Sequence, residues 1–220
     1  MGVLLLTPLR QERPDGANAR RSVVRELHPG RSSDAEIVAE LRAGVRSAAA
    51  LLFDRYGRHV ERLLWSLLGP DADAEDLLHE VFLRAMAGIG DIEDPSRLRS
   101  WITGIAVITA REHIRRSQRR RWLRFVEEVP ERAQIVASEE VNEATRCTFE
   151  VLTSMGADER VLFSLRFIEG MELAEIAVAC DVSLSTTKRR LKDAEKHFVA
   201  RARRIPALLP WLEEGRWADA

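Results

Sequence analysis

The sequence predicts an all-α protein made of two small helical domains joined by an acidic linker. Apolar residues make up 45% of the 220 residues, enough to build a buried core. They recur at the three- and four-residue spacings of amphipathic helices, and alternating runs rich in Val, Ile and Thr are absent. Charge is also segregated along the chain, although the formal net charge is only −1.

The charge falls into three blocks. Arg97–Arg124 holds nine Arg and one Glu, and Ser185–Arg204 holds eight Lys or Arg and two acids. Between them, Phe125–Glu150 holds seven Glu and two Arg. Because local charge sets the field that a phosphate backbone meets, the two basic blocks favour a nucleic-acid partner despite the net charge.

The N-terminal half predicts four helices after an extension. Residues 1–32 mix Arg, Pro and Gly without periodicity, which predicts a mobile extension. Ser33 or Asp34 can cap a first helix, and the apolar spacing of a second helix ends at Gly69-Pro70. A third helix begins near 71–73, where three residues include two acids suited to a helix N-terminus.

The fourth helix begins at Asp94-Pro95, with proline in its first turn. Its first half is apolar at helical spacing, and it becomes basic from Arg111 to Arg121. We therefore expect one end of this helix to be packed in a core and the other to face an anionic partner.

The C-terminal half predicts an acidic linker followed by three helices. The linker contains Pro130 and can include a helical segment from about Ser138. The later elements are a helix near 158–167, a break at 169–170, a short helix near 172–179, a turn at 180–183, a long helix to about 204, and a Trp-containing tail closed by Pro206 and Pro210.

The last two helices have the spacing of a helix-turn-helix. Ala177 is small where two helices approach, and Ile176, Val182 and Leu191 can form the wedge between them. Ser183 can cap the second helix by accepting from a backbone N–H near Thr186. A capped helix start with hydroxyls and cations suits the major groove. The candidate DNA-binding residues are Ser185, Thr186, Lys188, Arg189 and Lys192. An amphipathic hairpin with a solvated basic face is the alternative.

Two further segments resemble a known family. Asp73–Leu83 (DAEDLLHEVFL) resembles the second conserved region of sigma-70 factors, and Leu98–Ile102 with Gly104–Ala106 resembles the promoter-melting helix of that region. The helix-turn-helix resembles the fourth region of the same family. The order and separation of the segments are similar to small extracytoplasmic-function (ECF) sigma factors, which lack the third region.

The resemblance implies domain bounds and a function. It implies a transcription initiation factor that binds core RNA polymerase, directs it to promoters and helps to melt the minus-ten element. The expected divisions are the extension 1–32, a region 2-like domain 33–124, the linker 125–150, a region 4-like domain 151–204 for the minus-thirty-five element, and a tail 205–220.

The resemblance also implies site residues in the first domain. Asp76, Leu78, Glu80 and Phe82 would contact the clamp helices of the polymerase, where carboxylates can pair with basic residues around an apolar centre. On the alternative interpretation, Phe82 and its apolar neighbours are core and the acids a solvated face.

The minus-ten site would use the fourth predicted helix. Trp101 offers a π-face to unstacked bases and arginines hold the strand backbone, although a purely structural tryptophan is the equal alternative. The minus-ten candidates are Arg97, Arg99, Trp101, Arg111, Arg115 and Arg116.

Four positions depart from the family pattern. His79 replaces a common Gln, and Ile108 replaces a polar Asn near the minus-ten element. Asp181 replaces the turn glycine, a position where Asp tolerates left-handed geometry. Asp193 replaces a cation of the recognition helix and either reads cytosine or faces away from DNA.

Other function classes are less favoured. No Gly-rich phosphate loop is present and the five His lack ligand spacing, so we expect no catalytic residue, no metal and no cofactor. The alternative is a helix-turn-helix regulator that binds DNA without acting as a sigma factor, and a helical adaptor is a further one.

Partners and location follow from the same interpretation. We expect core RNA polymerase and promoter DNA as partners, together with an anti-sigma factor implied by the resemblance. No apolar run approaches the ~20 residues of a membrane span. Two cysteines are too few for a disulfide framework, which fits a cytoplasmic protein.

Overall fold

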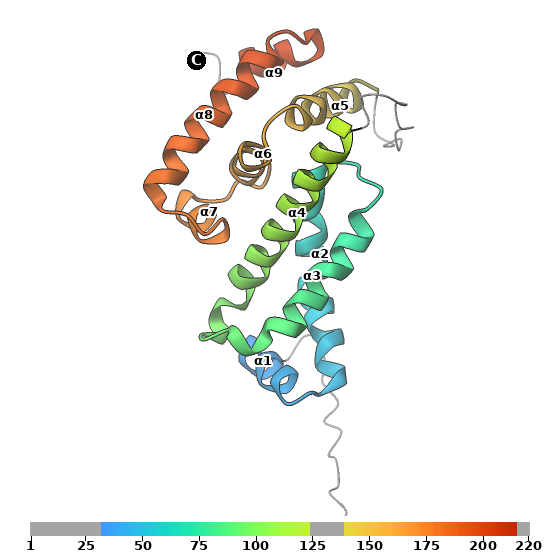
Figure 1. The fold of residues 1–220 in the computed structure, drawn as a ribbon, viewed down its shortest axis with the longest axis vertical. Helices are drawn as coiled ribbons and strands as arrows, with labels where there is room; N and C mark the ends of the chain where they lie inside the picture. Colours follow the sequence, from blue (N-terminus) through green and yellow to red (C-terminus); the bar gives the residue numbers. More distant parts are fainter. Residues whose placement is uncertain (1–31, 124–138, 215–220) are drawn as a thin grey trace, which may run out of the picture.

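A computed structural model describes residues 32–123 and 139–214, and in these ranges every regular element is a helix (Figure 1). Residues 1–31 of the predicted extension, residues 124–138 with the first part of the predicted linker, and the end of the tail from residue 215 lie outside the described residues. The rest of the predicted linker, 139–150, belongs to a helix, in agreement with the helical segment expected from about Ser138. The elements are α1 Asp34–Arg42, α2 Arg46–Leu68, α3 Ala74–Gly88, η1 Ile89–Asp91, η2 Pro95–Arg97, α4 Leu98–Leu123, α5 Glu139–Thr153, α6 Ala157–Phe163, η3 Ser164–Ile168, α7 Leu173–Ala179, α8 Leu184–Ala202, η4 Pro206–Leu208 and α9 Leu209–Glu214.

Local capping fixes the helix boundaries that the sequence predicts. Ser33 caps α1 in a full capping box with Glu36, and Gly69 ends α2 with a positive φ of 69°. Asp94 accepts a hydrogen bond from the Ser96 amide, so that the chain enters α4 through the short helix η2. These three boundaries confirm the predicted starts and stops.

The C-terminal half departs from the prediction at two places. The helix predicted near 158–167 is α6 followed by one wider π-helical turn, η3, and it ends at Gly170 with a φ of 71°. The tail is also helical: η4 and α9 each hold a proline in their first turn, and their side chains Leu208 and Leu212 are buried.

Two apolar clusters hold the chain together. One is formed mainly by α1 to α4, but it continues without a break into α6, η3, α7 and the first half of α8. The other cluster is formed by side chains of α5, α6, α8, η4 and α9 around the stacked rings of Phe163 and Phe198. We call α1–α4 the N-terminal unit and α5–α9 the C-terminal unit.

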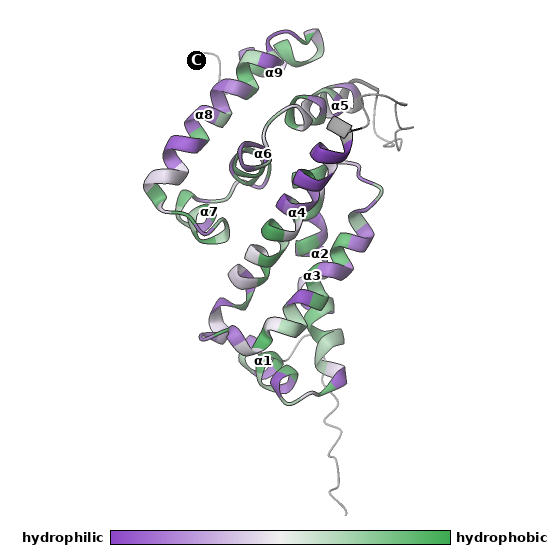
Figure 2. Ribbon diagram, in the orientation of Figure 1, coloured by the Kyte–Doolittle hydropathy of each residue, from purple (hydrophilic) through white to green (hydrophobic). Residues whose placement is uncertain are grey.

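Helix α4 is central in this arrangement. In Figure 1 it lies between α2 and α3 on one side and α6 and α7 on the other, with α8 outermost. Its first half is apolar and its second half is hydrophilic, as Figure 2 shows. A helix with cores on both sides therefore carries the predicted minus-ten residues.

Candidate nucleic-acid interface

Helix α3 presents two of its four predicted contact residues on one outer face, where Asp76 is exposed and Glu80 is half-buried. Leu78 is half-buried and packs against the main core on the opposite side of the helix. Phe82 is only 5% exposed and packs in the core, its ring centroid 4.9 Å from that of Phe53. Phe82 therefore packs α3 against α2 and is not available for a surface contact.

Sequence reasoning missed two apolar side chains near this face. Leu83 is 62% exposed, one helical turn beyond Glu80 and two beyond Asp76. Phe53 on α2 is 41% exposed and contacts Phe82. The spacing of 76, 80 and 83 on one helix is the signal that could have identified Leu83.

The start of α4 places two cations in solvent and the tryptophan at the edge of the core. Arg97 and Arg99 are exposed, while Trp101 is half-buried and packed against the main core. A Cβ added to Gly88 of α3 would lie 3.5 Å from the Trp101 ring, which places the indole in direct contact with this end of α3. Trp101 thus has a packing role and keeps part of its ring accessible.

The second half of α4 directs its arginines to two different neighbours. Arg111 and Arg115 both pair with Asp158 of α6, at 3.2 Å and 3.0 Å. Arg116 lies 3.9 Å from Glu80 of α3. The predicted minus-ten residues therefore do not form one free cationic surface, because two of them are held by the C-terminal unit.

The exposed Ile108 lies on the same helix. Its side chain is 43% exposed, so the apolar replacement of a polar family residue is at the surface and not in the core.

A buried histidine links α4 to the residues just before α3. His113 is 5% exposed; its Nε2 lies 3.0 Å from Asp71 and its Nδ1 lies 3.8 Å from Asp73. The hydrogen bond from His113 is the main cause that holds the pKa of Asp71 below its usual value. The carboxylate oxygens of Asp71 and Asp73 and a ring nitrogen of His113 lie within 4.8 Å of one another, close enough to hold a metal ion. The spacing of these residues along the sequence does not predict this grouping. Each ring nitrogen faces a different carboxylate, so the imidazole bridges the two.

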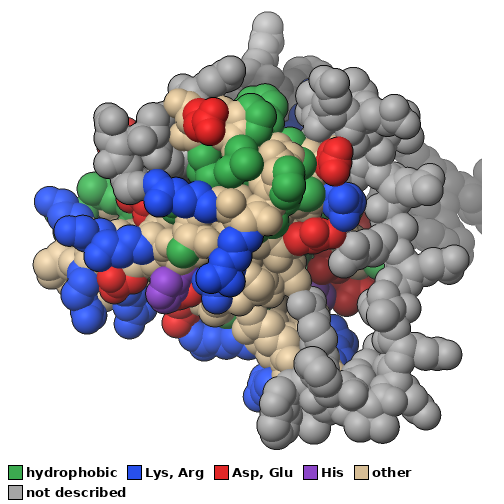
Figure 3. Space-filling view, turned by 90° about the horizontal axis from the view of Figure 1, so that it is seen from above, with side chains coloured by type: hydrophobic (Ala, Val, Ile, Leu, Met, Phe, Trp, Pro, Cys, Tyr) green, Lys and Arg blue, Asp and Glu red, His purple; other side chains and the backbone are tan. Residues whose placement is uncertain are grey.

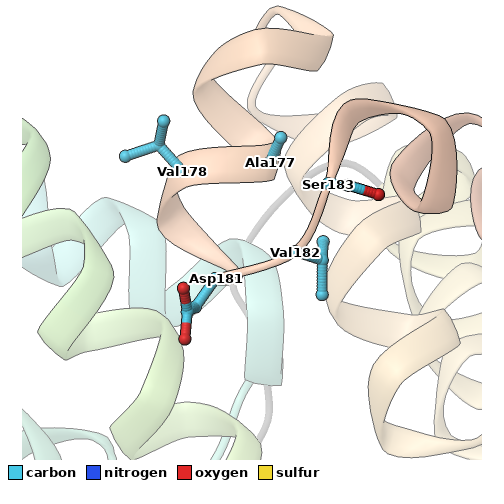
Figure 4. Close-up of a pocket in the computed structure, with 5 residues that line it drawn as sticks. All are labelled: Ala177, Val178, Asp181, Val182 and Ser183. Atoms are coloured by element: carbon cyan, nitrogen blue, oxygen red, sulfur yellow. The ribbon is translucent and has the colours of Figure 1, made fainter.

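The helix-turn-helix forms as predicted. Ser183 caps α8 by accepting from the Thr186 amide at 3.2 Å. Asp181 has a φ of 53°, the left-handed geometry expected where the family has glycine. Ile176 and Leu191 are buried, and Val182 packs against them as the wedge. Figure 4 shows Ala177, Val178, Asp181, Val182 and Ser183 around a shallow hollow at this turn.

The recognition face of α8 is free of the rest of the protein. Ser185, Lys188, Arg189 and Lys192 are exposed, and Thr186 is half-buried, its hydroxyl 2.8 Å from that of Ser183. Viewed from above, Lys and Arg gather on the side where α8 lies (Figure 3). Two exposed residues extend this face, each one helical turn beyond a predicted one: the missed Lys196, beyond Lys192, and Asp193, beyond Arg189.

Comparisons with known proteins agree with this geometry. Residues 52–120 match the family model of sigma-70 region 2, and residues 146–198 match that of sigma-70 region 4. Together the two matches span more than half of the chain. The chain belongs to the sigma-70 family.

The relatives that it resembles are ECF sigma factors. It is 25% identical over 173 residues to the ECF RNA polymerase sigma-E factor of Escherichia coli, covering 72% of this chain and 88% of the relative. It is 29% identical over 152 residues to the ECF RNA polymerase sigma factor BldN of Streptomyces coelicolor, covering 64% and 55%. The fold resembles that of CnrH, solved in complex with the cytosolic domain of CnrY, with a TM-score of 0.54, 21% identity and coverage of 79% and 99%.

As a sigma factor the protein is a transcription initiation factor, not an enzyme, and it binds core RNA polymerase and promoter DNA. The region 2 match accounts for the N-terminal unit, which a simple helix-turn-helix regulator would not contain. Among the described helices, none combines the length and the apolar content that crossing a bilayer requires.

Proposed function

We propose that this ECF sigma factor uses three separate surfaces during initiation. The exposed face of α3, with Asp76 and Glu80, docks on the polymerase, while Leu78 and Phe82 pack inward and hold the helix in place. The minus-ten strand meets Arg97, Arg99 and Trp101 at the start of α4, and its backbone continues along Arg111, Arg115 and Arg116. The face of α8 with Ser185, Thr186, Lys188, Arg189 and Lys192 enters the major groove of the minus-thirty-five element.

The open cationic face of α8 carries this proposal. Its start is capped by Ser183, which accepts from the Thr186 N–H, and exposed Ser185, Lys188 and Arg189 follow in the first two turns. Helix N-termini of this kind bind phosphates and present side chains to base edges. The acidic and apolar face of α3 is separate from this cationic face of α8 and suits a basic protein partner.

The proposed division of labour follows the two units. We place the start of the minus-thirty-five-binding unit at α5, because its buried residues pack against α8 and α9. The protein acts in the cytoplasm, where the polymerase is. A protein partner of the anti-sigma type would restrain it by covering these surfaces.

Run-off transcription tests the proposal directly. Purified protein is mixed with bacterial core polymerase and genomic fragments, and transcripts with defined starts are expected. Lys188→Ala with Arg189→Ala should abolish promoter choice while polymerase binding persists, and Asp76→Arg should weaken polymerase binding. Phe82 is left intact because its loss would open a cavity in the core.

Two control variants show whether the effects on promoter choice and polymerase binding depend on the positions that are changed. Arg190→Ala removes an exposed cation from α8 on a different side of the helix, and Glu93→Arg reverses an exposed acid away from α3. Both should behave like the wild type. Unchanged transcription in both test variants, or no defined start with any fragment, would contradict the proposal.

A further inference from the structure

Three side chains with metal-ligand chemistry meet where α4 passes the start of α3. His113 of α4 is 5% exposed, and its Nε2 and Nδ1 lie 3.0 Å from Asp71 and 3.8 Å from Asp73. One ligand atom from each residue lies within 4.8 Å of the other two. In the part of the chain that the structure describes, no other trio of His, Cys, Asp or Glu side chains comes this close together.

The segment before α3 places both carboxylates at the imidazole. Asp71 accepts from the Asp73 amide through Oδ1 at 2.9 Å, which leaves its Oδ2 for Nε2 of His113. Asp73 occupies the N-cap of α3 but makes no capping hydrogen bond with its side chain, although capping is the usual role of an aspartate at this position. Its carboxylate faces Nδ1 of His113 instead. Both acids are therefore arranged around the histidine and not around the helix end.

A buried hydroxyl beside the histidine is a second sign of a ligand. Thr109 lies one helical turn before His113, is 0% exposed, and its Oγ1 has no hydrogen-bond partner among the described residues. Because a helical side chain covers the turn that precedes its own Cα, the His113 ring lies over the turn that holds Thr109. Burying a hydroxyl without a partner is unfavourable, and a water held beside the imidazole would supply one.

The donor set suits zinc. Zn²⁺ takes imidazole and carboxylate ligands at about 2.0–2.2 Å, and three protein ligands leave a fourth position for water. Carboxylates alone favour Mg²⁺ or Ca²⁺, whereas an imidazole shifts the preference towards Zn²⁺. Ligand atoms on one tetrahedral ion lie about 3.4 Å apart, so small movements of the side chains bring these three into range. The Asp73 side chain is 51% exposed, which gives the ion a path of entry.

The neighbouring cations leave room for an ion. Arg120 lies 3.9 Å from Asp73, but its side chain is 57% exposed and is free to turn into solvent. Arg160, which lies near Asp71, donates to two backbone carbonyls at the end of α2. A divalent ion between two carboxylates and a neutral imidazole therefore balances their charge.

We propose that Asp71, Asp73 and His113 bind one Zn²⁺, with a water as the fourth ligand that hydrogen-bonds the Thr109 hydroxyl. The ion takes the place of the hydrogen bond between His113 and Asp71 and fastens the start of α3 to α4. Because the three ligands come together only in the folded chain, Zn²⁺ stabilises the fold. This site is separate from the polymerase- and DNA-binding surfaces proposed above and does not depend on them.

A zinc titration of the metal-free full chain, in competition with a fluorescent zinc chelator, measures the affinity. The wild type should bind one Zn²⁺ more tightly than Mg²⁺ or Ca²⁺. Asp73→Asn should weaken zinc binding by about tenfold or more, because the loss of even an outer-shell partner costs about 10- to 100-fold. Glu75→Gln is the matched control, since it removes an exposed acid from the same helix start; it should bind as the wild type does.

Two further readouts avoid any change to the buried histidine. In NMR spectra of the metal-free chain, Asp73→Asn should shift the ring signals of the histidine that it contacts, which identifies those of His113. Zn²⁺ should shift the same signals in the wild type. Zinc should also raise the Tm of the wild type and of Glu75→Gln, but not that of Asp73→Asn.

The outcomes decide the proposal. Zinc binding that is equal in the wild type and Asp73→Asn, or that leaves the His113 signals unshifted, would place the ion elsewhere on the chain and overturn the proposal. Equal affinities for Zn²⁺ and Mg²⁺ would also overturn it, because the imidazole would then contribute nothing. Binding that is lost in Asp73→Asn and kept in Glu75→Gln, with the His113 signals shifted by Zn²⁺, establishes the site.

Discussion

Single buried polar side chains hold elements together, and the clearest cases are Arg160 and His113. Arg160 is a cation at 6% exposure whose cost of burial is offset by two carbonyl acceptors. His113 bridges two carboxylates at similar depth. Neither pairing can be predicted from the sequence, because the partners of His113 and Arg160 lie 40 or more residues away. Local patterns report helix faces and caps, and they do not report which faces meet.

The pairing of Asp71 with His113 predicts a pH-dependent stability. The folded pKa of Asp71 lies below its ordinary value, so its contribution is complete above the unfolded pKa of about 3.9 and is lost as pH falls through the folded pKa. Asp71→Asn should therefore be less stable than the wild type at pH 7, and the gap should narrow below about pH 4. Urea unfolding at pH 7, 5, 4 and 3 measures this. The exposed Asp91→Asn is the control, and a gap independent of pH would contradict the assignment.

At the scale of elements, prediction succeeds where a boundary is encoded locally. Ser33, Gly69-Pro70, Asp94-Pro95 and Ser183 mark helix ends in the sequence, and the structure confirms each. It is less complete at η3, whose wider turn has no signal in the sequence, and at α9, where the sequence predicts an end at Pro210 but the proline lies in the first turn of a helix. Among the candidate site residues, Ser185, Lys188, Arg189 and Lys192 on α8 are exposed as expected and Thr186 is half-buried. Phe82 is buried, because one apolar residue fits either face of an amphipathic helix.

The cap on α8 gives a prediction at this scale. Ser183→Ala removes the hydrogen bond to the Thr186 amide and should cost about 1 kcal/mol, a fall of about 2–4 °C in Tm for a chain of this size. Thermal unfolding followed by circular dichroism checks this. Ser185→Ala, two residues further on the exposed face, should change Tm by less than half as much. Equal losses in the two variants would show that the Ser183 side chain does not act as a cap.

At the scale of the whole molecule, the two basic helices must satisfy two requirements. Its basic helices must reach DNA, and before that they must be compatible with a compact chain whose net charge is near zero. Packing α6 against α4 meets the second requirement with a single carboxylate, Asp158, placed between two arginines. Sequence analysis found both cationic helices but not this contact, because a carboxylate in a helix's first turn already has a local explanation in the helix dipole.

A glycine at the boundary between α2 and α5 tests the packing of the two units by shape alone. Gly69 ends α2 with a φ of 69°, and a Cβ there would lie 2.6 Å from the Phe149 ring of α5. Gly69→Ala should therefore push α5 away from α2 and increase the radius of gyration, measured by small-angle X-ray scattering of the free protein. Gly44→Ala is the control, because Gly44 also has a positive φ, 74°, but nothing lies within 4 Å of its added Cβ. Both variants strain the backbone, and only the first meets a neighbour across the boundary, so only the first should expand. Equal radii for the two would mean that the contact between α2 and α5 does not hold the units together in solution.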